Sequence, residues 1–217
     1  MNKQLLKTAR EYKGLLLFFV LMVMFRSAIA DWNDVPTGSM KPTIIEGDRI
    51  FVNKLAYDLR VPLTHISLVR LGEPERGDIV VFDSHAADRR LVKRVIGLPG
   101  DVVQMAAGRV IVNGQPAEYT DVRYEGNSMY ATESIGELQH PVRYDYDVTR
   151  AIDSFGPAIV PEDHYLMLGD NRRNSADSRY YGFVPYENLR GRPLFIYLSV
   201  DFAAWRIRWG RFGMRVR

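Results

Sequence analysis

One lysine stands apart from the other basic residues of this 217-residue chain. The sequence holds 23 arginines but six lysines, and after Lys54 it has one further lysine, Lys93. In the run LVKRVI, strand alternation places Lys93 on the face of Leu91 and Val95, and Arg94 on the opposite apolar face. Burial lowers the pKa of an ammonium group and can leave a neutral amine, whereas a guanidinium stays charged, so Lys93 is a candidate general base. The alternative is an edge strand from which both cations reach water.

A general base needs a nucleophile, and Ser39 has suitable surroundings. It lies in VPTGSMKP (residues 35–42), a Gly-Ser pair between two prolines. Gly38 permits a tight backbone and the close approach of a substrate, and the Thr37 hydroxyl and the Ser39 amide are candidate donors to an oxyanion. An ordinary turn with the same composition is the alternative.

A third polar cluster follows the apolar run at residues 165–168. Its sequence is GDNRRNSADSR (residues 169–179). Ser175 can orient a catalytic amine by a hydrogen bond, while Asp177 and Arg179 can pair and hold the loop rigid. The alternative is an Asx-rich surface turn.

Residue types exclude several other chemistries. The chain has no cysteine, which rules out disulfides, thiolate metal sites and cysteine nucleophiles. His65, His85, His140 and His164 are scattered without metal-ligand spacing. We therefore expect neither a metal site nor a cofactor.

Positive charge is concentrated at the two ends of the chain. The first 13 residues carry four basic side chains and one acidic one, and the last 12 carry five arginines and no acid. The net charge is +3, so the segment between the ends is acidic. This distribution argues against a nucleic-acid partner and favours contact with an anionic membrane surface.

An apolar run at residues 14–25, GLLLFFVLMVMF, follows the basic N-terminus. With Arg26 near its end, the stretch to residue 30 is a marginal membrane span, and the positive-inside rule predicts a cytoplasmic N-terminus. We expect one transmembrane anchor over residues 1–30. A cleaved secretory signal ending at Ala28-Ile29-Ala30 and a buried core helix are the alternatives.

The rest of the chain predicts a mostly β fold built of antiparallel sheets. Short runs rich in β-branched residues recur between glycine-containing turns, at residues 49–53, 78–82, 90–96, 102–104, 109–112, 165–168 and 194–198. Asn113-Gly114 after residues 109–112 is typical of a hairpin. We expect one catalytic domain over residues 31–217, with an inserted β-rich subdomain at roughly 106–162.

Five ordered motifs resemble those of bacterial type I signal peptidases. They are residues 35–42, 47–60 (GDRIFVNKLAYDLR), 76–82 (RGDIVVF), 91–101 (LVKRVIGLPGD) and 169–185 (GDNRRNSADSRYYGFVP). The resemblance implies a membrane-anchored serine endopeptidase that removes signal peptides from exported preproteins at the outer, or periplasmic, face of the bacterial cytoplasmic membrane.

Site residues carry over from this resemblance by position. Ser39 resembles the nucleophile and Lys93 the general base of a Ser-Lys dyad. Thr37 matches the oxyanion hydroxyl and Ser175 the residue that orients the lysine. Asp177 and Arg179 match the supporting pair.

Two further expectations concern partners. Preproteins with small residues before the cleavage site would fit shallow apolar pockets, for which Val35 and Val92 are candidate walls. Phe202, Trp205, Trp209 and Phe212, interleaved with arginines, predict either an amphipathic stretch at the membrane surface or a last β-strand.

Two positions depart from the family pattern, and two other classes of protein compete with it. Thr37 stands where many members have serine, and Arg173 stands where the residue is often acidic. The competing classes are a self-cleaving Ser-Lys regulator, which would carry an N-terminal pair of DNA-binding helices, and a non-enzymatic envelope protein with the same fold.

Overall fold

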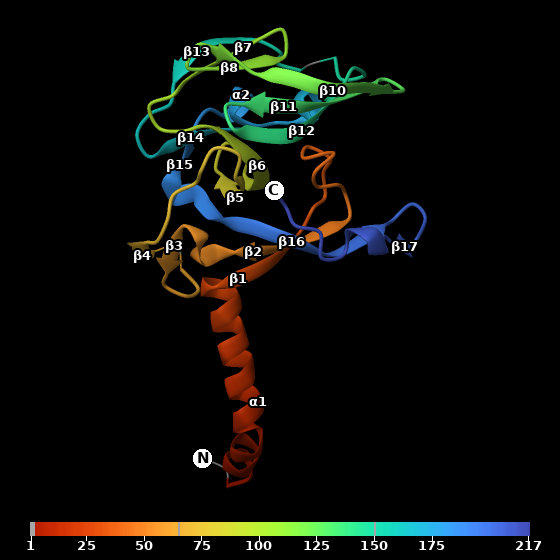
Figure 1. The fold of residues 1–217 in the computed structure, drawn as a ribbon. Helices are drawn as coiled ribbons and strands as arrows, with labels where there is room; N and C mark the ends of the chain where they lie inside the picture. The colour runs from red at the N-terminus through yellow and green to blue at the C-terminus, as the bar shows by residue number, and fades with distance from the viewer. Residues whose placement is uncertain (1–2, 65, 150) are drawn as a thin grey trace.

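The computed structural model describes residues 3–64, 66–149 and 151–217. A long helix, α1 (Lys3–Ala28), extends from one end of a β-rich body (Figure 1). Its apolar side chains between Leu15 and Phe25 are all exposed, so α1 is not a buried core helix. Within the described residues, no helix is both long enough and apolar enough to cross a membrane.

One large sheet forms the centre of the body. Its strands run in the order β1, β2, β16, β5, β6, β14 and β15, and β17 pairs with β16. The bounds are β1 (Ala30–Asp34), β2 (Asp48–Asn53), β5 (Ile79–Ser84), β6 (Arg89–Gly97), β14 (His164–Leu168), β15 (Val184–Pro185), β16 (Leu189–Asp201) and β17 (Arg206–Ile207). A two-stranded sheet of β3 (Asp58–Arg60) and β4 (Ser67–Arg70) lies near the α1 end (Figure 1).

Two smaller sheets lie at the end of the body away from α1 (Figure 1). One contains β13 (Phe155–Ile159), β7 (Val102–Ala106), β8 (Arg109–Val112) and β9 (Gln115–Pro116). The other contains β10 (Glu118–Glu125), β11 (Ser128–Ile135) and β12 (Leu138–Asp145). Strand pairing is antiparallel in every described sheet, as expected from the short strands and tight turns.

Short helical turns complete the described chain. They are η1 (Lys54–Ala56), η2 (Arg172–Asn174), α2 (Ser178–Tyr181), η3 (Tyr186–Asn188) and η4 (Trp209–Arg211).

Strand composition explains how these elements pack. The run at β5 is apolar on both faces, and Val81 and Val80 enter two different core clusters. A third cluster, which includes Ile96 and Val103, joins the central sheet to β7. The Asn113-Gly114 signal is confirmed as a hairpin, because both residues have positive φ (52° and 78°) and β8 pairs with β9.

The edge-strand alternative for Lys93 and Arg94 is wrong. Strand β6 pairs with β5 on one side and with β14 on the other, so it is an inner strand of the sheet. The two cations are 2% and 1% exposed, and Lys93 lies opposite Val80 across the strands. Both cations therefore depend on polar partners inside the protein.

Candidate active site

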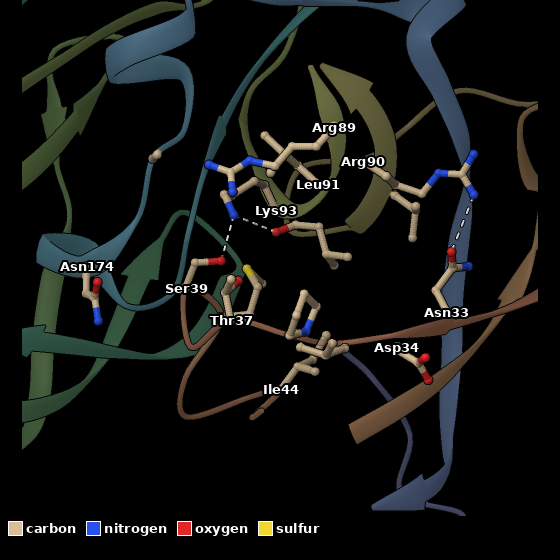
Figure 2. A pocket seen from close by; sticks show the side chains of 16 residues that line it. Asn33, Asp34, Thr37, Ser39, Ile44, Arg89, Arg90, Leu91, Lys93 and Asn174 are labelled. Carbon is tan, nitrogen blue, oxygen red and sulfur yellow. Dashed lines mark hydrogen bonds between the residues drawn. The ribbon is translucent and has the colours of Figure 1, made fainter. Parts of the chain in front are cut away.

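Ser39 and Lys93 meet in a cleft between two elements that are distant in sequence. Ser39 lies in the loop that joins β1 to β2, and Lys93 lies in β6. Lys93 Nζ is 2.7 Å from Ser39 Oγ and 3.0 Å from the carbonyl oxygen of Val92 (Figure 2). At this distance the Lys93 amine and the Ser39 hydroxyl form a hydrogen bond.

The surroundings of Lys93 favour the neutral amine. Burial lowers the pKa of Lys93 to about 8. Asp177 and Asp170 act against this effect, while the positive charges of Arg89 and Arg179 add to it. A lysine with this pKa is neutral in about half of the molecules at pH 8, which an unperturbed lysine is not.

The loop that carries Ser39 is hydrogen-bonded to the polar loop after β14. The amide of Asn171 donates to the carbonyl oxygen of Ser39 at 3.0 Å. Its side-chain Nδ2 donates to the carbonyl oxygen of Gly38 at 3.2 Å and to Asp145 Oδ2 at 2.8 Å. Both ends of the asparagine therefore hold the loop that carries Ser39.

Gly169 allows the two loops to come this close. A Cβ at this position would collide with Ser175 Oγ and would lie 2.5 Å from the carbonyl oxygen of Ser39. Ser175 is buried beside the main chain of Ser39, and its Oγ has no hydrogen-bond partner among the described residues. The structure therefore brings Ser175 to the site without a hydrogen bond to Lys93.

Asp177 and Arg179 form a buried ion pair below this loop. Arg179 Nε and Nη2 lie 2.8 and 2.7 Å from the two Asp177 oxygens, and Arg179 Nη1 donates to the carbonyl oxygen of Ile152 at 2.8 Å. Asp177 Oδ2 also accepts from the amide of Gly169 at 3.0 Å. Although burial raises the pKa of Asp177, its bonds to Arg179 outweigh burial and lower that pKa, so the carboxylate stays charged.

A cleft of about 300 Å³ surrounds the Ser39–Lys93 pair. Val35, Thr37 and Val92 line it, together with Ala176. Thr37 is exposed and lies beside Ser39 (Figure 2). Small and branched apolar side chains therefore line part of the cleft, together with the hydroxyl groups of Thr37 and Ser39 and with charged side chains such as Arg89 and Arg90.

Sequence reasoning missed three groups near this cleft. Arg94 forms a two-pronged ion pair with Asp170 at 2.8 and 2.7 Å, and both are buried. Arg172 forms another buried pair with Glu133, which attaches η2 to β11. Asn171 is the third. Strand alternation in the sequence indicated that Arg94 would be buried. It did not indicate which carboxylate would form the ion pair with Arg94.

Side chains that bind metals do not cluster in the part of the chain that the structure describes. No group of three His, Asp or Glu side chains among them has a suitable arrangement. His65 lies outside the described residues.

Comparisons with known proteins give the class. A family model described as signal peptidase, peptidase S26, matches residues 9–198. The chain is 36% identical to signal peptidase I from Pseudomonas fluorescens, in an alignment that covers 83% of this chain and 69% of that protein. It is 37% identical to a probable signal peptidase I-2 from Synechocystis, with 80% and 65% covered. A crystal structure of a signal peptidase I from Enterococcus faecalis matches with 32% identity and a TM-score of 0.35, covering 55% of this chain and 96% of that one.

The protein is thus a hydrolase of the serine peptidase class. It belongs to the signal peptidase I family, peptidase S26, and acts on exported preproteins that carry signal peptides. The N-terminal segment of the described chain is a single helix, α1, and not a pair of helices.

Proposed function

We propose that the protein cuts signal peptides from preproteins with a Ser39–Lys93 dyad. The observation that carries this proposal is the 2.7 Å contact between Ser39 Oγ and the buried Lys93 Nζ. Only a neutral amine can accept the serine proton, and burial is what makes that form available near neutral pH.

The reaction follows the usual course of acyl transfer. Neutral Lys93 takes the proton of Ser39, and Ser39 Oγ attacks the scissile carbonyl carbon to form a tetrahedral intermediate. Lys93 then gives the proton to the leaving amine as the peptide bond breaks. A water molecule, deprotonated by Lys93, attacks the acyl-enzyme carbonyl. The bond to Ser39 Oγ then breaks as Lys93 returns the proton to Oγ, which releases the signal peptide with a free carboxyl group.

The oxyanion would be stabilised by two donors. The Ser39 amide is one, and the Thr37 hydroxyl is the other because it lines the same cleft. Threonine keeps the hydroxyl that serine would supply and adds one methyl group beside it.

Three residues would position the dyad. Asp177 and Arg179 keep the loop rigid through their buried pair. Ser175, whose Oγ is buried beside the loop of Ser39, would turn its hydroxyl toward Lys93 when the amine becomes charged. Such a partner would help Lys93 to hold its proton after the attack.

Small side chains before the cut would fit the cleft. Val35 and Val92 narrow the space next to Ser39, and both line the same cavity. Branched side chains near the nucleophile leave room for alanine or glycine in the substrate and exclude larger residues.

Helix α1 would anchor the enzyme in the bacterial cytoplasmic membrane as a single pass, with residues 31–217 as the catalytic domain on the outer face. Its end is tied to the body, because Lys54 Nζ donates to the carbonyl oxygens of Arg26 (2.9 Å) and Ser27 (3.1 Å). Strand β1 begins two residues after α1. These contacts favour a retained anchor over a cleaved signal, since cleavage would remove part of the folded body.

The C-terminal segment would rest on the lipid surface. Trp205 and Trp209 are 86% and 72% exposed, and Phe202 and Phe212 are exposed as well. Strand β17 covers only two residues here, so the segment is mostly turns. Exposed aromatic rings beside arginines suit the interface of an anionic membrane.

Cleavage of a purified preprotein in detergent tests the proposed function. We expect release of the signal peptide and a new N-terminus directly after a small residue, identified by mass spectrometry. Absence of cleavage, or cleavage only inside the mature part, would contradict the proposal.

A further inference from the structure

A second cavity lies in the layer formed by β7 to β13, away from Ser39. Its volume is about 400 Å³. Aromatic and basic side chains dominate its walls, including Tyr119, Tyr124, Tyr144, Tyr146, Arg109 and Arg173. Neither the dyad nor the proposed pockets for small residues use this cavity.

The walls of this cavity carry an excess of positive charge. Arg173 Nε lies 3.2 Å from Asp153 Oδ2, so that pair is neutralised. Arg109 has no carboxylate within ion-pair distance among the described residues, and its guanidinium lies 5.3 Å from the ring centre of Tyr119. A carboxylate entering between these tyrosines would find an unpaired cation.

The turn η2 connects this cavity to the catalytic cleft. Asn174 lines the cleft (Figure 2), while its neighbour Arg173 lines the second cavity. Successive side chains of a 3₁₀ turn point about 120° apart, which lets one short turn face both spaces. Because Asn171 is bonded to Ser39, the backbone of Arg173 lies within roughly 15 Å of the nucleophile, a span of about five extended residues.

The arrangement of the layers gives the direction of the substrate. Helix α1 and the β7–β13 layer lie at opposite ends of the body (Figure 1). A preprotein whose signal peptide is held in the membrane reaches Ser39 from the α1 end. The chain after the cut then leaves toward the β7–β13 layer, across η2.

We propose that this cavity binds the beginning of the mature part of the preprotein, about four to six residues after the cut, and favours an acidic side chain there. The inference rests on the proposed function. In this proposal Arg109 and Arg173, which lie outside the dyad, determine the preference for an acidic side chain after the cut.

Paired substrates test the proposal in the full-length enzyme in detergent. One preprotein carries Glu at the fifth position after the cut, and its partner carries Lys at that position. We expect kcat/KM to be about two- to fivefold higher for the Glu substrate at low salt, the effect of one partly exposed charge pair, and the difference to shrink in 1 M salt.

Three variants locate the effect. In Arg109→Gln and Arg173→Gln the ratio of the two kcat/KM values should fall toward one. Arg123→Gln is the control, because Arg123 is an exposed arginine of β10 that pairs with Glu125 and is not part of this cavity. It should keep the wild-type ratio.

The outcomes separate this inference from the proposed function. A preparation that cuts neither substrate contradicts the proposed function. Efficient cleavage with a ratio near one overturns the inference alone, as does a ratio that Arg109→Gln and Arg173→Gln leave unchanged. Equal slowing of both substrates by these variants would also overturn it, because it would indicate an effect on the η2 backbone. Loss of the preference in millimolar inorganic phosphate at constant ionic strength would assign the cavity to small anions instead.

Discussion

The main-chain amide of Asn171 donates a hydrogen bond to the carbonyl oxygen of Ser39, at 3.0 Å. This bond joins the loop after β14 to the loop before β2. The side chain of Asn171 also donates a hydrogen bond to the carbonyl oxygen of Gly38. The position of the nucleophile is therefore set by a residue more than 130 positions away in the chain.

Replacement of Ser39 by alanine should abolish cleavage of a preprotein. The change removes one hydroxyl from a half-buried loop and opens no large cavity, so the melting temperature should stay near that of the wild type. Cleavage and thermal unfolding are measured on the same preparation. Residual activity above about one thousandth of the wild-type rate would show that another group is the nucleophile.

The Lys93→Arg variant tests whether Lys93 acts as a general base or only as a positive charge. Arginine keeps the positive charge but offers no neutral amine at any working pH, so activity should be lost completely. A substantial remaining rate would mean that Lys93 only positions the substrate, since a guanidinium can make such contacts equally well. Circular dichroism of the variant checks that the added bulk at this buried position has not unfolded the domain.

Activity should fall on the acid side of pH 8. Burial lowers the pKa of Lys93 to about 8, so the amine is mostly neutral above this pH and mostly charged below it. A base must be neutral to accept a proton, and kcat/KM should therefore be about tenfold lower at pH 7 than at pH 9. A profile that is flat from pH 6 to pH 9 would remove Lys93 from the proton transfer.

Gly169→Ala should damage both stability and activity. The new Cβ would collide with Ser175 Oγ and approach the carbonyl oxygen of Ser39, and such overpacking costs about 1–3 kcal/mol. We expect at least a tenfold loss of kcat, because the nucleophile loop must move. Gly156→Ala is the matched control, since a Cβ there meets nothing within 4 Å. Equal behaviour of the two variants would contradict the close packing described for Gly169.

Trp205 and Trp209 should touch lipid. A Trp32→Phe variant leaves these two as the only tryptophans of the chain, so its fluorescence reports on the C-terminal segment. In liposomes of anionic lipid, brominated acyl chains should quench this fluorescence, and unbrominated lipid should not. Equal intensity in both would contradict membrane contact.

Deletion of residues 202–217 would be a poorer test of the same contact. Val216 is part of a core cluster, and Arg211 pairs with the buried Asp48. Truncation would therefore disturb the fold as well as the surface, and the fluorescence experiment avoids this problem.

The sequence by itself determined the elements and the reactive groups. Runs of β-branched residues between glycine-containing turns predicted the main strands, and Asn113-Gly114 predicted the hairpin. Both predictions were possible because these signals depend on residues close together in the chain. The rarity of lysine singled out Lys93, and the motifs around Ser39 and residues 169–179 indicated the family. Local chemistry was enough for each of these predictions.

Only the tertiary structure decided how these groups meet. Lys93 lies on an inner strand, between β5 and β14, and its amine contacts Ser39 in the loop that joins β1 to β2. Neither the strand order nor this contact can be read from the alternation of one strand. Arg94 found its partner 76 residues away in Asp170, and η2 came to face two cavities because Arg172 is buried against Glu133. Such long-range pairings depend on the packing of whole sheets. This packing determines the burial of Lys93 and therefore the pKa of its amine, which no local sequence pattern contains.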